Sequence, residues 1–149
     1  MIKVLIQVAG GSSERRIYDE QTLEYKGTRQ GSHPYIYPYG FILGTRAEDG
    51  GSVDCYIITH DNLQAGSIVE CEPIGLLEQD EDGEIDHKVL ASMPNQQVEV
   101  GRELLQEMQD FIYLIFAGHP DMRVTVGDIL PREEALRHIQ EHLENQSKN

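Results

Sequence analysis

The hydrophobic period of this chain changes near residue 100. Up to about residue 98, the apolar residues fall in short β-branched and aromatic runs separated by turns that contain glycine, which is typical of strands. After Val100 they recur every three or four residues, as on the buried side of a helix. A chain that places its strands first and its helices last is expected to fold as an α+β protein.

The expected strands are short and separated by turns, an arrangement that favours a small barrel or a sandwich. They cover residues 2–8, 35–45, 53–59, 68–77 and 88–93, and residues 122–126 form a further short strand. No repeat or linker divides the chain, so residues 1–149 are expected to form a single domain.

Two helices are expected after Val100. The first has an apolar side formed by Leu104, Leu105, Met108, Phe111, Ile112 and Ile115, and it ends before Pro120. The second begins at Pro131, which suits the first turn of a helix, and Leu136, Ile139 and Leu143 give it one apolar side. Its string HIQEH resembles an inverted zinc-protease motif, but both histidines are expected to face solvent.

The charge of the chain limits its partners. Twenty-six acidic residues against 12 basic ones give a net charge of −14, which argues against a surface for nucleic acid or anionic membrane. No apolar stretch approaches the roughly 20 residues of a membrane span, and residues 1–11 suggest a first strand, not a signal peptide. Cys55 and Cys71 lie in strand-like runs and are expected as reduced thiols, so a cytoplasmic location is predicted.

Two acidic loops are candidates for a cation site. Residues 48–54 read EDGGSVD, and residues 78–88 read EQDEDGEIDHK. Carboxylate oxygens are the ligands that Mg²⁺ prefers. Asp-Gly pairs are also ordinary turn chemistry, so composition leaves open whether these loops bind a metal or are solvated turns.

From Tyr35 onward the chain resembles the family I soluble inorganic pyrophosphatases. YIYPYGFI is similar to the family string Y-P-x-N-Y-G-x-I, and DGGSVDCYII is similar to the signature D-G-D-P-x-D with its following strand. AGSIVECEPIGLL and GEIDHK then match the next two family segments in order and separation. The resemblance implies an OB-like twisted β-barrel with two flanking helices in the C-terminal third. It also implies Mg²⁺-dependent hydrolysis of pyrophosphate to two phosphates by a metal-activated water, with Mn²⁺ as a substitute metal.

The resemblance implies a role for several residues. Asp49, Asp54, Glu81 and Asp86 match metal ligands, with Asp80 and Asp82 as alternatives to Glu81. Lys88, Tyr39, Tyr113 and Arg16 match groups that hold substrate phosphate. Asp49, Asp54 and Lys88 are the expected catalytic residues.

Some family positions are changed in this chain. Gly51 stands where the family has the central signature aspartate, and Leu114 stands where it has a phosphate-binding lysine. Gln7 and Tyr18 replace two carboxylates, and either Lys26 or Arg29 matches a substrate arginine. Glu48 and Ser52 are the nearest candidates to substitute for the central aspartate.

These changes leave the activity open. Loss of a positioned general base typically lowers a rate by about 10²–10⁴, so a divergent inorganic pyrophosphatase of reduced activity is the first hypothesis. The alternatives are an inactive member that serves as a phosphate-binding or oligomerising module, and a phosphohydrolase for another substrate. The resemblance also implies a homo-oligomer.

Overall fold

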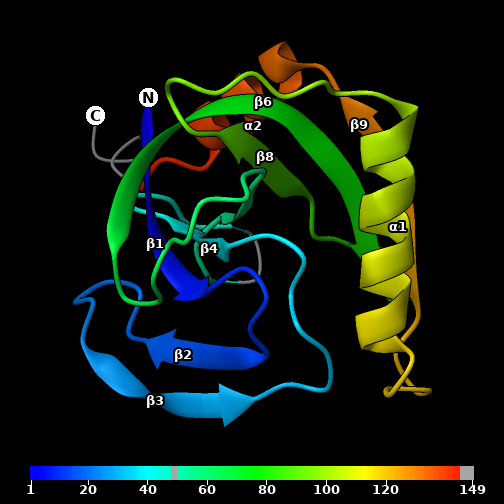
Figure 1. Cartoon of the computed structure of the whole chain (residues 1–149), viewed down its shortest axis with the longest axis horizontal. Coiled ribbons are helices and arrows are strands. Elements are labelled where there is room, and N and C mark those ends of the chain that lie inside the picture. Colours follow the sequence, from blue (N-terminus) through cyan, green and yellow to red (C-terminus); the bar gives the residue numbers. More distant parts are fainter. Residues whose placement is uncertain (48–49, 145–149) are drawn as a thin grey trace.

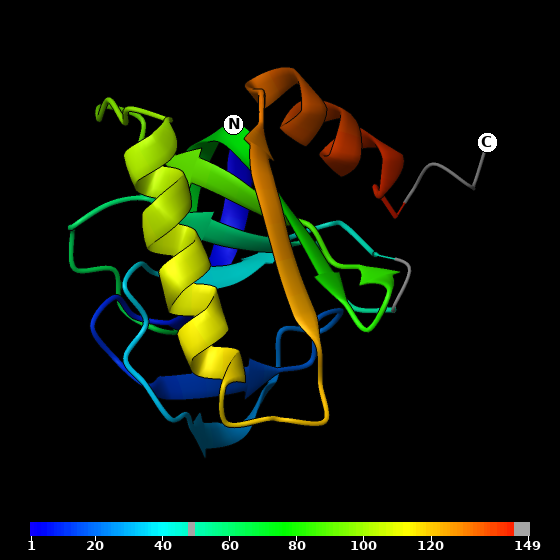
Figure 2. The ribbon, with the colours of Figure 1, turned by 90° about the vertical axis from the view of Figure 1, so that its right-hand side faces the viewer.

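A computed structural model of the chain describes residues 1–47 and 50–144, and Figures 1 and 2 show it from two directions. Nine strands and two helices are assigned within these residues. In chain order they are β1 (Ile2–Val8), β2 (Glu14–Tyr18), β3 (Tyr25–Gln30), β4 (Tyr39–Ile42), β5 (Asp54–Ile57), β6 (Ile68–Glu81), β7 (Glu84–Ile85), β8 (Lys88–Ser92), α1 (Arg102–Phe116), β9 (Val124–Leu130) and α2 (Arg132–Glu141).

Five strands pair in a closed ring. β1 pairs with β4, β4 with β5, β5 with β8, β8 with β6, and β6 returns to pair with β1. The long, curved β6 crosses the molecule as the green arc of Figure 1. The β5–β8 pair is parallel and the other pairs are antiparallel. This arrangement confirms the expected α+β class and OB-like architecture.

Gly40 is required where two strands of this ring approach each other. A Cβ atom at residue 40 would lie 1.9 Å from the carbonyl oxygen of Leu5 on β1, a distance that no side chain tolerates. The glycine of the tyrosine-glycine motif therefore allows β4 to pair closely with β1.

The side chains on the two faces of the ring of strands belong to two different hydrophobic cores. Val4, Cys55 and Val89 belong to a core that α2 completes with Ala135 and Ile139. Residues with the opposite strand phase, such as Tyr56 and Leu90, belong to a second core. Helix α1 covers that core and runs alongside β9 (Figure 2). Lys88 lies two residues before Leu90 on β8, so both side chains point to the same face, the one that α1 covers.

The structure confirms most of the expected elements and shifts others. β1 has the expected bounds, and α1 buries Leu104, Met108, Phe111 and Ile112 of the predicted stripe. The last strand lies at Val124–Leu130 instead of 122–126, and only Tyr39–Ile42 of 35–45 is a strand. The β2–β3 hairpin was not expected, because its strands are mostly polar and exposed.

The predicted apolar side of α2 was correct for Ile139 and wrong for Leu136 and Leu143. Leu136 and Leu143 are exposed by 41% and 37%, whereas Ala135 and Ile139 are buried. The helix is turned so that His138 and His142 are half-buried. Their rings lie 4.4 Å apart, and His138 lies 6.0 Å from the ring of His87.

Two simpler expectations concern the cysteines and the membrane. Cys55 and Cys71 are both buried and free, as predicted. Among the described residues, neither helix is long and apolar enough to cross a membrane.

Candidate functional site

A buried lysine forms the centre of the site. The Nζ atom of Lys88 donates to Asp54 Oδ2 at 2.7 Å, to Asp86 Oδ2 at 2.8 Å and to the Tyr39 hydroxyl at 3.3 Å. An ammonium group has three donors, so each has a partner. The Lys88 side chain is 7% exposed, against 24% for Asp54 and 26% for Asp86.

The charge of Lys88 is maintained despite its burial. Burial alone lowers the pKa of a lysine, but Tyr39, Asp54 and Asp86 outweigh it and hold the pKa of Lys88 well above its usual value. The site therefore contains a fixed positive charge between two carboxylates. We refer to Lys88, Asp54, Asp86 and Tyr39 as the Lys88 cluster.

Aromatic rings form one wall of the Lys88 cluster. The Tyr39 ring lies 4.7 Å from that of Tyr56 and 5.5 Å from that of Tyr35, and Phe111 of α1 lies 5.0 Å from Tyr35. Burial, followed by the Asp54 carboxylate, raises the pKa of Tyr39 well above its usual value. Tyr39 is therefore a neutral hydroxyl that accepts from Lys88 and retains its own proton to donate.

Arg15 adds a second positive charge above Tyr39. Its Cζ atom lies 5.5 Å from the centre of the Tyr39 ring, within the range of a cation–π contact. Burial lowers the pKa of Arg15, but Tyr39, Tyr35 and Asp54 raise it by more. The guanidinium is thus charged, and it lies on the same side of the molecule as the Lys88 cluster.

The prediction named Arg16 instead of Arg15. Arg16 is exposed, donates to the Tyr18 hydroxyl at 3.4 Å and lies over the Tyr25 ring. Successive strand residues point to opposite faces, so only one of the two arginines can face Tyr39, and the structure places Arg15 there. Arg29 pairs directly with Arg15 across the β2–β3 hairpin, so it shares that face.

The second acidic loop also contributes to the site. Burial and then the neighbouring Asp86 carboxyl raise the pKa of Glu81 to about 7. Burial works against ionisation of Asp86, but Glu81 and Lys88 lower its pKa below the usual value. The pKa values of Glu81 and Asp86 are therefore moved in opposite directions, which favours the ionised form of Asp86 over that of Glu81.

The structure separates Glu81 from its two alternatives. Asp80 Oδ1 accepts the backbone N–H of Gly83 at 2.7 Å, and Asp82 Oδ1 accepts that of Arg123 at 2.9 Å. Asp80 thus fixes the turn between β6 and β7, and Asp82 ties this turn to the segment before β9. Glu81 instead contacts Gln79 and Asp86, which places it beside the Lys88 cluster.

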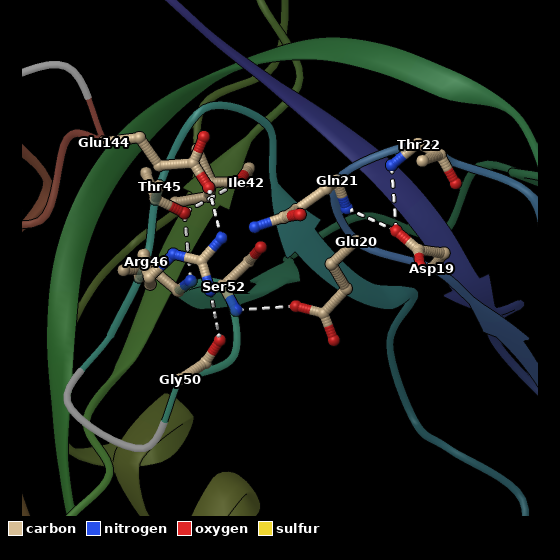
Figure 3. Close-up of polar contacts among 11 residues, drawn as sticks. Asp19, Glu20, Gln21, Thr22, Ile42, Thr45, Arg46, Gly50, Ser52 and Glu144 are labelled. Atoms are coloured by element: carbon tan, nitrogen blue, oxygen red, sulfur yellow. Dashed lines mark hydrogen bonds and ion pairs between the residues drawn. The ribbon is translucent and has the colours of Figure 1, made fainter.

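Asp49 and Glu48 lie outside the described residues, but the rest of their loop is held by several contacts (Figure 3). Arg46 donates to the carbonyl of Gly50 and pairs with Glu144 near the end of α2, both at 3.1 Å. The backbone N–H of Ser52 donates to Glu20 Oε1 at 2.5 Å. A carboxylate from the β2–β3 turn therefore lies against the loop beside Gly51, which has none.

The remaining predicted residues lie at other places. The Tyr113 hydroxyl accepts the N–H of Val126 at 2.9 Å and ties α1 to β9. Its neighbour Leu114 is 49% exposed. Gln7 is buried and donates to the carbonyl oxygen of Arg16 at 3.3 Å. A substrate role for Tyr113 stays a prediction.

A cavity of about 600 Å³ lies away from the Lys88 cluster. It is lined by the loop after β5, by residues 96–99 and by the start of α1. Its floor includes Tyr37, whose hydroxyl donates to Glu107 at 2.6 Å. Its described lining includes the carboxylates of Asp61, Glu99, Glu103 and Glu107 and no lysine or arginine, so it offers an anionic ligand no positive charge.

The acidic residues around Lys88 determine whether a divalent cation fits this site. Within residues 1–47 and 50–144, no three His, Cys, Asp or Glu side chains are arranged to hold a metal ion. Asp54, Glu81 and Asp86 nevertheless provide the carboxylate oxygens that hard cations prefer. The buried Oε1 of Gln79, next to Glu81, has no hydrogen-bond partner among the described residues, which suits a hydrated ion. The residues therefore fit a cation that keeps several waters.

The fold and the site together are typical of proteins that act on phosphoryl groups. A ring of strands with a covering helix presents one lysine and one arginine among carboxylates and a tyrosine hydroxyl. Such a mixed arrangement suits an anion bound together with cations, as in phosphoryl chemistry.

Comparison with known proteins identifies the family. Residues 4–147 match the family described as inorganic pyrophosphatase, and the chain belongs to this family. The resemblance inferred from the sequence is thereby confirmed.

Named relatives agree with this assignment. An inorganic pyrophosphatase from Nanoarchaeum equitans is 30% identical over 99% of this chain and 98% of its own length. One from Sulfolobus acidocaldarius is 39% identical, over 61% of this chain and only 54% of the relative. A crystal structure of inorganic pyrophosphatase from Thermus thermophilus has a TM-score of 0.82 at 27% identity, covering 95% of this chain and 88% of that one.

Proposed function

We propose that this protein hydrolyses pyrophosphate to two phosphates with the help of Mg²⁺. The observation that carries the proposal is the Lys88 cluster, in which a buried, charged lysine lies between Asp54 and Asp86 and contacts Tyr39. Family membership supplies the reaction. A bound divalent cation lowers the pKa of its water and neutralises phosphoryl oxygens.

The residues of this chain have distinct roles in the proposal. Lys88 and Arg15 neutralise phosphate oxygens, and the Tyr39 hydroxyl donates to one of them. Because the three Lys88 donors are occupied, a phosphate oxygen has to replace an acceptor, and the 3.3 Å contact with Tyr39 is the longest of the three. Asp54, Glu81 and Asp86, together with Asp49 outside the described residues, would hold the cation.

The activity is expected to be low because Gly51 supplies no carboxylate to take the proton of the attacking water. Glu20 is a described carboxylate that contacts this loop, at the backbone N–H of Ser52. Its other oxygen, Oε2, is the candidate to take over part of that role. A general base typically contributes about 10²–10⁴ to a rate, so the deficit is measurable.

A second function is favoured by one observation. Lys88 is already neutralised by two carboxylates at 2.7 and 2.8 Å, as in a purely structural ion cluster. With Gly51 and Leu114 at family positions for Asp and Lys, the chain would then be an inactive phosphate-binding or oligomerising member.

Phosphate release from pyrophosphate with Mg²⁺ separates the two functions. Three proteins are compared, namely the natural chain, Gly51→Asp, and Gly51→Asp with Leu114→Lys. Release by the natural chain, increased by Gly51→Asp, is the expected result. If only the variants release phosphate, the natural chain is the inactive member. If all three are folded and inert, the proposal of hydrolysis is wrong.

Assembly and location form a further part of the proposal. We propose a homo-oligomer in the cytoplasm, supported by the family and by the two buried free cysteines, which suit a reducing compartment. Light scattering after size-exclusion chromatography tests the oligomer, and a monomer mass would contradict it.

A further inference from the structure

Gln79 is a buried amide with an unpaired oxygen. Its side chain lies on β6 and is 2% exposed. Among the described residues, its Oε1 is the only buried side-chain nitrogen or oxygen without a hydrogen-bond partner. An unpaired buried acceptor costs about 1–3 kcal/mol, so it requires a physical explanation.

The other end of the amide holds a proposed cation ligand. Gln79 Nε2 donates to Glu81 Oε2 at 3.1 Å. Leu77, Gln79 and Glu81 alternate along β6 and therefore point to one face. Leu77 pairs across the sheet with Lys88, so this face is the one that carries the Lys88 cluster.

The orientation of the amide follows from its neighbour. If the amide were turned over, Oε1 would face the oxygens of Glu81, and two acceptors would repel each other while Glu81 is ionised. The orientation that satisfies an ionised Glu81 is therefore the one that leaves Oε1 unpaired.

The backbone of Gln79 holds the opposite side of the acidic loop. Its N–H donates to His87 Nδ1 at 3.0 Å, and its carbonyl accepts the N–H of Asp86 at 2.9 Å. One residue is thus bonded to Glu81 through its side chain and to Asp86 through its main chain. It therefore links the carboxylate of Glu81 to the backbone of Asp86.

We propose that Gln79 is a positioning residue for the divalent cation. Its Nε2 fixes the Glu81 carboxylate next to Asp86. Water does not reach its buried Oε1 in the cation-free protein, and binding of the ion shifts the amide so that Oε1 accepts a hydrogen bond from one of the waters of the hydrated ion. Mg²⁺ keeps several of its waters when bound, and outer partners of this kind commonly change metal affinity by about 10–100-fold. This inference rests on the cation of the proposed function.

Mn²⁺ binding to the full chain tests this role, measured by electron paramagnetic resonance of the free ion. Gln79→Met keeps the approximate volume and removes both polar atoms. Gln106→Met is the matched control, because Gln106 is exposed on α1 and bonds only to Asp110 in the described contacts. We expect Gln79→Met to weaken Mn²⁺ binding about tenfold, with the control unchanged.

Urea unfolding without metal separates positioning from structural support. Gln79→Met removes the unpaired acceptor, which is favourable, and also the Nε2 donor to Glu81, which is unfavourable. Because the two effects offset each other, we expect the cation-free variant to be about as stable as the natural chain. If Gln79→Met unfolds during purification, Gln79→Leu replaces it.

Three other results would overturn the inference. Unchanged Mn²⁺ affinity in Gln79→Met, with binding by the natural chain, would refute the role of Gln79 alone. If Gln79→Met binds Mn²⁺ more weakly and is also less stable in urea without metal, Gln79 only supports the fold and does not position the ion. Absence of Mn²⁺ binding to the natural chain would refute the cation site itself, and the role of Gln79 with it.

Discussion

The Lys88 cluster and the loop at residues 46–52 are held together in different ways. In the Lys88 cluster, strand residues bring a 7% exposed lysine to two carboxylates. The loop is held by Arg46 and Glu144, which are 43% and 37% exposed, and by the Glu20 carboxylate from a distant turn. The Lys88 cluster is therefore built into the sheet, whereas the described part of the loop depends on exposed contacts that water and salt weaken.

Removing Lys88 is expected to have the largest effect. Lys88→Met leaves Asp54 and Asp86 as neighbouring carboxylates without their cation, and breaking such a buried pair costs on the order of 3 kcal/mol. Urea unfolding measures this loss, and phosphate release should fall below detection. Lys3→Met is the control, because Lys3 is exposed on β1 and has no role in the proposed site. If Lys88→Met and the natural chain are equally stable, the bonds from Lys88 to Asp54 and Asp86 do not stabilise the fold.

The two neighbouring arginines provide a sharper test. Arg15→Gln removes the charge above Tyr39, and hydrogen bonds to charged groups contribute about 1.5–3 kcal/mol. We expect KM for pyrophosphate to rise about tenfold or more, because 1.4 kcal/mol corresponds to a factor of ten. Arg16→Gln should leave KM within about twofold. The reverse result would restore the original prediction for Arg16.

The loop contact is expected to give a smaller effect. Glu20→Gln keeps an oxygen that accepts the Ser52 N–H but removes its charge, which is worth less than about 1 kcal/mol at an exposed site. The Ser52 amide proton resonance should shift, and Mn²⁺ affinity should fall severalfold. Glu24→Gln, on the same hairpin, should change neither. An unshifted Ser52 amide would mean that Glu20 does not bind the loop in solution.

The smallest effect concerns pH in the cation-free protein. Because the pKa of Glu81 is raised to about 7, its contribution to stability is complete below its ordinary pKa and is lost as pH rises through 7. Asp86, whose pKa is lowered, acts in the opposite sense and loses its contribution only in acid. Urea unfolding at about pH 5 and pH 8 should therefore show a decline that Glu81→Gln reduces. A decline of equal size in that variant would exclude Glu81 as its source.

Much of the fold was predictable because its elements have strong hydrophobic periods. The apolar residues of β1 and of α1 recur with a period that the sequence alone reveals. The β2–β3 hairpin does not, because its polar strands have exposed sides and little apolar alternation. In α2 the stripe was misplaced because Leu136 is a stronger apolar signal than Ala135, yet tertiary packing buries the smaller residue.

The family resemblance named four residues that the structure brings into contact. Asp54, Asp86 and Tyr39 all bond to Lys88, whereas their roles stay predictions. The choice between Arg15 and Arg16 depends on the register of the hairpin, and a slip of one residue reverses every side chain. Gln79 and Glu20 gave no signal, since a lone amide or a turn carboxylate has meaning only once its neighbours are placed.

The pairing of β1 with β6 also has a consequence for folding. Ile2 pairs with Cys71, and Leu5 pairs with Ile68. The ring therefore closes only when two strands that are far apart in the sequence pair with each other. Contacts between such distant residues delay folding because the chain loses loop entropy before it gains them. We expect refolding on a millisecond-to-second scale, with β1 exposing an unpaired edge until β6 arrives.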